Sequence, residues 1–306
     1  MRAILQLAAI VLLLLVNVSV VEAQSAAAEN SPTAPPKIVL LVYRKIQFGK
    51  VSERQKLEGG MSRACDRLPV PNSWIDLESV TGAQEVVSFD PMDSFEQIDK
   101  AFSIWGQIYA THPELARLQQ QIDATLASER TIIAVRRDDL GYRAMSIDLS
   151  KARFLRVLEV RLQPGHESDF TEAFKMLSTA YGKIDSDTPW MVYQVNTGMP
   201  SPSFLIFVPM TALRQNDDLL ARQKSLREAE GEEVAERMQQ IAREAYASTE
   251  SNLYYINAEV SHVSKEFAAG DPDFWTPKKL ANVKSGESAP ATKAAVPKSG
   301  AAKPKP

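Results

Sequence analysis

Two short segments of this sequence combine Trp with carboxylate and amide side chains at alternating positions. Side chains two residues apart on a β-strand share one face of the sheet, so Trp74, Asp76 and Glu78 are expected to lie together. Aromatic, carboxylate, amide and guanidinium groups on one face suit an enclosed polar pocket, in which a buried carboxylate is a candidate base. The candidate ligand-binding residues found in this way are Trp74, Asp76, Glu78, Glu159, Arg161, Trp190, Gln194 and Asn196.

The same pattern is also typical of a sheet that binds no ligand. In that interpretation Trp74 and Trp190 fill the core between two sheets, and the charged side chains are solvated or paired. The sequence leaves both interpretations open and identifies no catalytic residue.

The other reactive side chains form no recognisable site. His112, His166 and His262 are far apart, and none stands at metal-ligand spacing from another His or Cys. Cys65 is the only cysteine, which excludes an internal disulfide and favours an inert core residue. Gly-rich phosphate loops, Gly-x-Ser-x-Gly and Cys-x-x-Cys motifs are missing. We therefore predict no metal and no cofactor, and whether the protein is an enzyme stays undecided at this point.

The body of the chain repeats itself. Gly49 and Gly165 are 116 residues apart, and so are Trp74 and Trp190. Phe-Asp-Pro-Met at 89–92 returns as Phe-Val-Pro-Met at 207–210. Anchors that recur in one order predict two copies of one domain.

Each copy shows the same order of patterns, which is strand, helix, two strands, helix, strand. The strands expected in the first copy are 38–45, 74–78, 83–89 and 130–135, and those in the second are 154–162, 190–196, 203–208 and 252–256. This order is the βαββαβ topology of ferredoxin-like domains. We predict an α+β fold of two tandem ferredoxin-like βαββαβ units, packed sheet to sheet.

The ends of the chain differ from its body in composition. Arg2, an apolar run at 4–16 and Val-Glu-Ala at 21–23 predict a signal peptide cleaved near Ala23, and therefore a secreted or periplasmic protein. An uncleaved membrane anchor is the alternative. The predicted division is signal peptide 1–23, disordered linker 24–36, first repeat 37–136, linker 137–152, second repeat 153–263 and C-terminal extension 264–306, disordered from about 278.

Charge is distributed unevenly along the 306 residues, whose formal net charge is -3. Residues 277–306 contain seven Lys and one Glu, so the body is acidic and is not expected to bind nucleic acid. The basic tail is either a solvated extension or an attachment to an anionic envelope surface. With 44% hydrophobic residues the body can form a sizeable core, and we expect a monomer with an internal pseudo-dimer.

Three features carry a resemblance to a known superfamily: Leu-Glu-Val-Arg-Leu-Gln-Pro-Gly at 158–165 followed by Phe170 and Phe174, Trp190, and Ala-Thr-His-Pro-Glu-Leu at 110–115. Over 37–263 the sequence resembles the dimeric α/β-barrel superfamily, and within it NIPSNAP-like and antibiotic-biosynthesis-monooxygenase-like domains. The resemblance implies that the two units form an intramolecular dimeric α/β barrel. It implies a range of functions, because the superfamily includes cofactor-independent oxygenases, haem-degrading enzymes, isomerases and proteins with no known reaction.

Three functions follow from these observations. The first is an exported, non-catalytic binding or interaction protein with a small apolar or amphipathic ligand between its two sheets. The alternative is a cofactor-independent oxygenase or isomerase of the dimeric α/β-barrel type. A third is a structural role at the cell envelope with the basic tail as tether.

Overall fold

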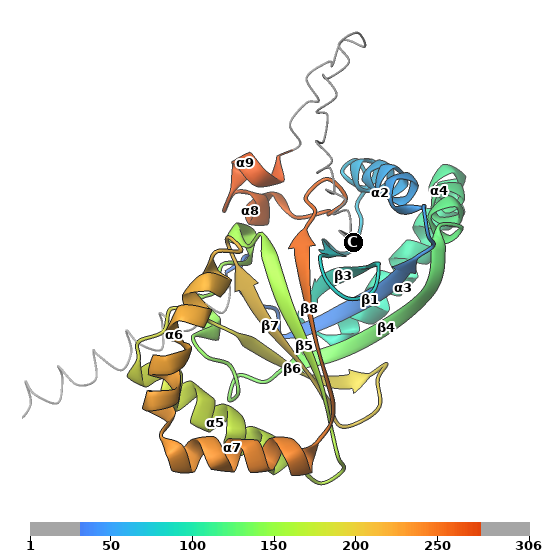
Figure 1. Cartoon of the computed structure of the whole chain (residues 1–306). Helices are drawn as coiled ribbons and strands as arrows, with labels where there is room; N and C mark the ends of the chain where they lie inside the picture. Colours follow the sequence, from blue (N-terminus) through green and yellow to red (C-terminus); the bar gives the residue numbers. More distant parts are fainter. Residues whose placement is uncertain (1–30, 277–306) are drawn as a thin grey trace, which may run out of the picture. The chain divides into compact units, whose positions relative to one another are not determined.

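The computed structural model describes residues 31–276, in which eight strands form one closed barrel with helices outside it (Figure 1). The elements of the first half are β1 (Ile38–Ile46), α2 (Val51–Cys65), β2 (Ile75–Ser79), β3 (Glu85–Met92), α3 (Phe95–Thr111), α4 (Pro113–Asp123) and β4 (Leu126–Arg136). Those of the second half are β5 (Phe154–Leu162), α5 (Glu167–Lys183), β6 (Met191–Thr197), β7 (Ser203–Met210), α6 (Gln215–Glu230), α7 (Glu232–Ala245) and β8 (Tyr246–Ile256). The predicted mixed fold of helices and a closed barrel is confirmed.

Strand order around the barrel is β1-β3-β2-β8-β5-β7-β6-β4. The antiparallel pairs β2–β8 and β4–β6 join the two halves into a single sheet. The sheets of the two halves, which were predicted to pack against each other as a barrel, are therefore one continuous sheet, because edge strands that pair directly leave no unpaired backbone groups at the seams. In addition, the single helical region expected before the last strand of each half consists of two helices.

The two halves repeat the same strand register. Ile38 lies opposite Met92 between β1 and β3, and Phe154 lies opposite Met210 between β5 and β7. A position in one half therefore has an equivalent position in the other. Gly49 and Gly165 are one such pair, and both have a positive φ, +79° and +88°, which is strained for residues with a Cβ.

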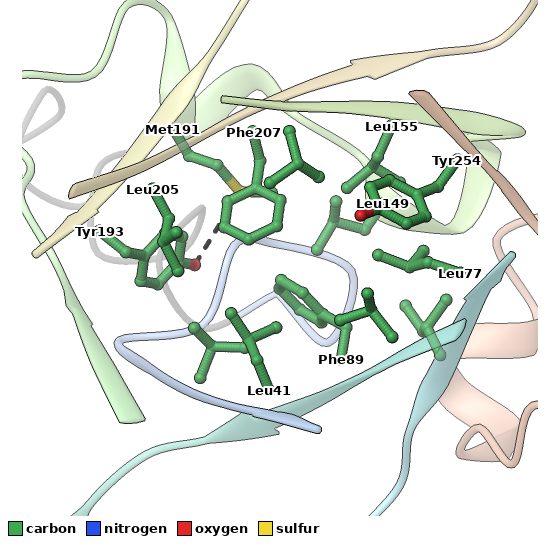
Figure 2. Packing of buried hydrophobic residues seen from close by; sticks show 14 of the residues in the cluster. Leu41, Leu77, Phe89, Leu149, Leu155, Met191, Tyr193, Leu205, Phe207 and Tyr254 are labelled. Carbon is green, nitrogen blue, oxygen red and sulfur yellow. Dashed lines mark hydrogen bonds between the residues drawn. The ribbon is translucent and has the colours of Figure 1, made fainter. Parts of the chain in front are cut away.

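The barrel interior is packed with apolar side chains from both halves (Figure 2). Leu41 and Phe89 of the first half meet Leu205 and Phe207 of the second, with the Phe89 and Phe207 rings 5.6 Å apart and edge to face. The ligand pocket expected between the two sheets therefore falls in a filled core, which corrects that expectation. Alternation along the strands sends the opposite set of side chains outward to the helices.

Short elements outside the repeated pattern complete this core. Phe267 of α8 (Lys265–Ala268) and Trp275 of α9 (Pro272–Trp275) are buried in the interior cluster. The Trp275 Nε1 donates to the Ser150 carbonyl at 2.7 Å, which connects α9 to the segment between the halves. Residues 264–276 are thus part of the folded body.

Several sequence predictions fall on residues that the structure does not describe. The signal peptide, residues 24–30 of the linker and the tail from 277 lie outside the described range. Among residues 31–276, no helix has the length and hydropathy needed to cross a membrane.

Candidate functional site

A cavity of about 310 Å³ lies in the first half, between the outward face of β1, β2 and β3 and the helices α2, α3 and α4. Its aromatic lining residues are Trp74, Phe102, Trp105 and Tyr109. Its charged and hydrogen-bonding lining residues include Arg44, Glu58, Asn72, Asp76, Ser88 and Asp90. The cavity combines an apolar wall with several ionisable groups, as small-molecule sites do.

Two Trp side chains form one wall. Trp74 is held by antiparallel backbone pairing with His262, and its Nε1 donates to the Val260 carbonyl at 3.1 Å. The Trp105 Nε1 donates to the Asn72 Oδ1 at 2.8 Å, and the Trp74 and Trp105 ring centroids are 6.4 Å apart. Each indole N–H is satisfied by the protein, so both rings are fixed in place and offer apolar faces.

Asp90 on β3 is a buried carboxyl group with one free oxygen. Its Oδ2 accepts a hydrogen bond from the Asn72 Nδ2 at 3.0 Å, whereas its Oδ1 has no partner. Burial raises the pKa of Asp90 to about 8, and Arg44 opposes this increase only in part. Near neutral pH this carboxyl group therefore exists in both protonation states.

Glu58 on α2 is the second carboxyl group of this kind. Its Oε2 accepts a hydrogen bond from Arg54, one turn earlier on the same helix, and its Oε1 has no partner. Burial raises the pKa of Glu58 to about 8, and the negative charge of Asp76 adds to this effect. Amphipathic spacing explains its location, because Arg54 and Glu58 lie on the same stripe of α2 as the buried Met61 and Cys65.

Glu78 on β2 lies behind the cavity and holds Arg54 in place. It accepts hydrogen bonds at 2.8 Å from the Arg54 Nη2, the Gln55 Nε2 and the Tyr255 hydroxyl, and at 2.5 Å from the Asn257 Nδ2. Four donors on one carboxylate fix its position. Glu78 is therefore a structural anchor of the site.

Asp76 and Arg44 form a chain along the sheet surface. The Ser88 hydroxyl donates to the Asp76 Oδ1 at 2.5 Å and accepts from the Arg44 Nη1 at 2.9 Å, and the Arg44 Nε donates to Glu129 at 3.0 Å. Burial raises the pKa of Asp76, and Arg44 opposes the shift. This chain places a guanidinium group beside three buried carboxyl groups.

The second half carries no such charges at the equivalent positions. The matching positions of strands and helices in the two halves define which residues are equivalent. The equivalent residues are Arg44 and Val160, Arg54 and Phe170, Glu58 and Phe174, Asp76 and Val192, Ser88 and Ile206, and Asp90 and Val208. These six apolar residues are buried together in one cluster with Trp190. The fold therefore forms without the polar cluster, which indicates that the charges of the first half are not needed for folding.

The sequence-predicted residues lie in four places. Trp74 and Asp76 line the cavity and Glu78 stands directly behind it. Trp190 and Gln194 occupy the equivalent outward face of the second half, where Trp190 is buried and Gln194 accepts from Arg137 at 2.9 Å. Asn196, on the same strand, and Arg161 are exposed.

Glu159 lies on the barrel side of β5 and pairs with Arg130 at 3.3 Å. The alternation rule grouped Trp74, Asp76 and Glu78 correctly. However, these residues were expected on the sheet face that is free of helices, and the structure places them under the helices. Period-two spacing identifies which residues share a face, but not which element covers that face.

Sequence reasoning missed most of the charged cluster. Arg44, Arg54, Glu58, Asp90 and Trp105 were not among the candidates, although Arg54 and Glu58 recur at helical spacing with the buried Met61. A comparison of the two aligned tetrapeptides at 89–92 and 207–210 reveals Asp90 against Val208. Charged residues at positions that are apolar in the other half were the available signal.

The lone Cys and the three His have structural roles. Cys65 is buried, and burial raises the pKa of its thiol to about 12, so it is a poor nucleophile. His112 and His166 stand at helix starts, and the His262 ring packs at a tilt against Trp74 with ring centroids 4.9 Å apart. Within residues 31–276, no group of three or more His, Cys, Asp or Glu side chains is arranged to hold a metal ion.

Comparison with known proteins gives structural matches only. No family model matches the chain, and no curated protein matches its sequence. A crystal structure of an anthrone oxidase-like protein is 12% identical with a TM-score of 0.48, and the match covers 75% of this chain and 93% of that one. A candidate monooxygenase from Lactobacillus acidophilus is 10% identical, with a TM-score of 0.45 and coverage of 74% and 95%.

A heme-binding protein from Thermus thermophilus is also similar, at 10% identity, a TM-score of 0.44 and coverage of 74% and 96%. The anthrone oxidase-like and monooxygenase names are of the kind expected from the sequence resemblance. The main functional expectation, a non-catalytic binding or interaction protein, is corrected by these findings: the similar structures are named for oxidase-like, monooxygenase and heme-binding proteins.

Proposed function

We propose that the first-half cavity is the active site of an enzyme that removes a proton from a small aromatic substrate by carboxyl acid–base chemistry. The observation that carries this proposal is that Glu58 and Asp90 line an aromatic cavity and each has one carboxyl oxygen without a hydrogen-bond partner. Buried polar atoms are nearly always hydrogen-bonded, so two unpartnered oxygens beside one cavity indicate groups kept for a ligand.

The energetic cost of the cluster supports a functional role. Apolar side chains in place of a buried ion pair are often neutral or stabilising by about 1–4 kcal/mol. The second half contains that replacement, since Phe170 and Phe174 occupy the positions equivalent to Arg54 and Glu58. A cluster that the fold does not need, and that costs stability, is expected at a site of chemistry.

The proposed step is a single proton transfer. The ionised carboxylate of Asp90 accepts a proton from a weakly acidic C–H or O–H bond, and the electron pair of that bond remains on the substrate as an anion. Glu58 in its neutral form can donate a proton at a second position. A pKa of about 8 for both groups makes each protonation state accessible near neutral pH.

A cofactor-independent oxygenase or isomerase is the alternative function expected from the sequence, and this proton transfer is the first step of both reactions. An isomerase returns the proton to a different carbon of the anion. A cofactor-independent oxygenase lets the anion reduce dioxygen, which is then the oxidant. Oxygen uptake measured with an electrode distinguishes the two, because only the oxygenase consumes dioxygen.

A haem does not fit this cavity. Its volume of about 310 Å³ lies at the lower end of the range of small-ligand pockets and is too small for a porphyrin with its side chains. None of the described residues that line it is a His or a Cys, and three of them are buried carboxyl groups. We therefore derive no step through haem.

The two halves are, within this proposal, tandem copies of one ferredoxin-like unit, of which the first carries the site. The strand orders β4-β1-β3-β2 and β8-β5-β7-β6, with equal register, support this inference. The finer resemblance to NIPSNAP-like domains stays a prediction.

The test uses nitrobenzisoxazole, an aromatic probe for buried bases. A base removes its C–H proton, the N–O bond breaks, and a coloured cyanonitrophenolate is released. We expect the full chain to catalyse this elimination with a rate that rises with pH and levels off above pH 8, where most Asp90 side chains are ionised.

Variants identify the base in this assay. Asp90→Asn should lower the rate at least tenfold, whereas Asp93→Asn, an exposed neighbour just beyond β3, should leave it unchanged. Equal rates for wild type, Asp90→Asn and Glu58→Gln would overturn the proposal.

A further inference from the structure

The charged cluster around the cavity has more acidic than basic groups. Two guanidinium groups, of Arg44 and Arg54, lie among four buried carboxyl groups, those of Glu58, Asp76, Glu78 and Asp90. A buried excess of negative charge requires a proton or a cation for each uncompensated carboxylate. Protons on Glu58 and Asp90 supply part of this compensation, since burial raises the pKa of both groups to about 8.

The aromatic wall of the same cavity is suited to a positive charge. The Trp74 and Trp105 rings lie at the cavity with both indole N–H groups already bonded to the protein. The Tyr109 hydroxyl donates to Gln119 at 3.3 Å, and burial raises the Tyr109 pKa to about 12, so it stays neutral. Aromatic faces attract cations through their quadrupole, and Trp does so most strongly.

We infer that the substrate of this site is an organic cation, an amine with an aromatic or apolar body, bound by the free oxygens of Glu58 and Asp90 and by the Trp74–Trp105 wall. The inference rests on the proposed function in naming the substrate class of the same cavity. The volume of about 310 Å³ accommodates a single-ring or two-ring amine.

Cation binding has a direct chemical consequence. An ammonium group, which like that of Lys stays protonated to about pH 10, lowers the pKa of a carboxyl group that it contacts. Asp90 or Glu58 then releases its proton to solvent and becomes the carboxylate that the proposed reaction needs. The substrate itself would therefore switch on the base.

The pH dependence follows from all charged groups that face these two acids. Arg44 and Asp76 face Asp90, while Arg54, Arg44, Asp76 and Glu78 face Glu58. Below pH 8 each displaced proton weakens amine binding about tenfold per pH unit. Affinity should therefore rise from pH 6 to pH 8 and then level off.

Isothermal titration calorimetry with three matched probes tests the inference on the full chain. Phenylethylamine, phenylethanol and phenylpropanoate share an aromatic ring and a short chain but carry a positive, a neutral and a negative head group. We expect phenylethylamine to bind at least tenfold more tightly than phenylethanol at pH 8, and phenylpropanoate not to bind.

Two substitutions and two matched controls locate the contact. Asp90→Asn and Glu58→Gln should each weaken phenylethylamine binding at least tenfold and leave phenylethanol binding unchanged. Asp93→Asn, and Glu53→Gln on the exposed side of α2, should change neither. Circular dichroism of each variant verifies that it is folded.

Two outcomes would overturn the inference. The first is that phenylethanol binds as tightly as phenylethylamine, and the second is that phenylethylamine shows no saturable binding or the same affinity in all variants. If either occurs while nitrobenzisoxazole is still converted in an Asp90-dependent way, only the substrate class is wrong. Loss of both signals contradicts the proposed function as well.

Discussion

Replacing Asp90 with Asn should stabilise the protein, and the gain should grow as the pH rises. Asp90 is 8% exposed, its Oδ1 has no hydrogen-bond partner, and burial raises its pKa from an ordinary 3.8 to about 8. Asn has nearly the same shape, keeps an oxygen that can accept from Asn72, and has no charge to bury. The substitution therefore removes an ionisation penalty and little packing.

The expected magnitude follows from proton linkage. Between pH 4 and pH 8 the folded state holds a proton on Asp90 that the unfolded state has lost, so the free energy of unfolding falls by about 1.4 kcal/mol per pH unit. The contribution of Asp90 is fully present below its unfolded pKa and is lost as the pH rises to about 8. From pH 5 to pH 7 the advantage of Asp90→Asn over wild type should grow by about 3 kcal/mol, as an upper limit.

Urea denaturation followed by circular dichroism at pH 5, 6 and 7 measures this difference. Asp93→Asn is the matched control, because its carboxylate is exposed, and it should show the pH slope of the wild type. An Asp90→Asn variant whose free energy of unfolding differs from wild type by a constant amount across this range would mean that Asp90 is ionised in the folded protein. That result would refute the protonated state of Asp90 on which the proposed function depends.

Two further predictions concern residues away from the cavity acids. Trp190→Ala should lower the free energy of unfolding, measured by urea denaturation, by about 3–5 kcal/mol. The reason is that Trp190 is buried, packs on Tyr142 and Tyr181 and donates to the Leu140 carbonyl at 3.0 Å. A loss below about 1 kcal/mol would contradict this packing. Cys65 should resist a thiol reagent at pH 8 in the native protein and react fully in urea, as measured by mass spectrometry, because burial raises its pKa to about 12. Equal labelling rates in both states would show that the thiol is accessible.

The order of elements could be derived from the sequence, and the location of the site could not. The recurring Gly49 and Gly165 and the paired Trp74 and Trp190 indicated the repeated order of elements, because a positive φ and a large ring packed against neighbouring side chains constrain residue type locally. The cavity depends on segments that come together only in the folded chain. Trp105 of α3 reaches Asn72 before β2, and Tyr255 of β8 reaches Glu78.

The choice of sheet face shows the limit most clearly. Asp76 and Glu78 were placed on one face correctly, but toward the other half of the barrel and not toward α2 and α3. Alternating polarity usually marks a solvated face, and here the charged side chains are buried under helices whose own charges meet them, as with Arg54 and Glu78. Buried charge that is paired across two elements leaves no periodic signature of burial in either one.

Both halves of the barrel belong to one polypeptide, and this has a consequence for how the site could arise. In a barrel assembled from two identical chains, every substitution appears twice, so a buried acid would destabilise both halves at once. In a single chain, Asp90 does not require an acid at the equivalent Val208, and the well-packed half around Phe170 and Trp190 helps to keep the whole barrel folded. Because the two halves are covalently connected, one half can contain buried acids while the other stays apolar. A symmetric assembly would contain the same destabilising acids in both halves.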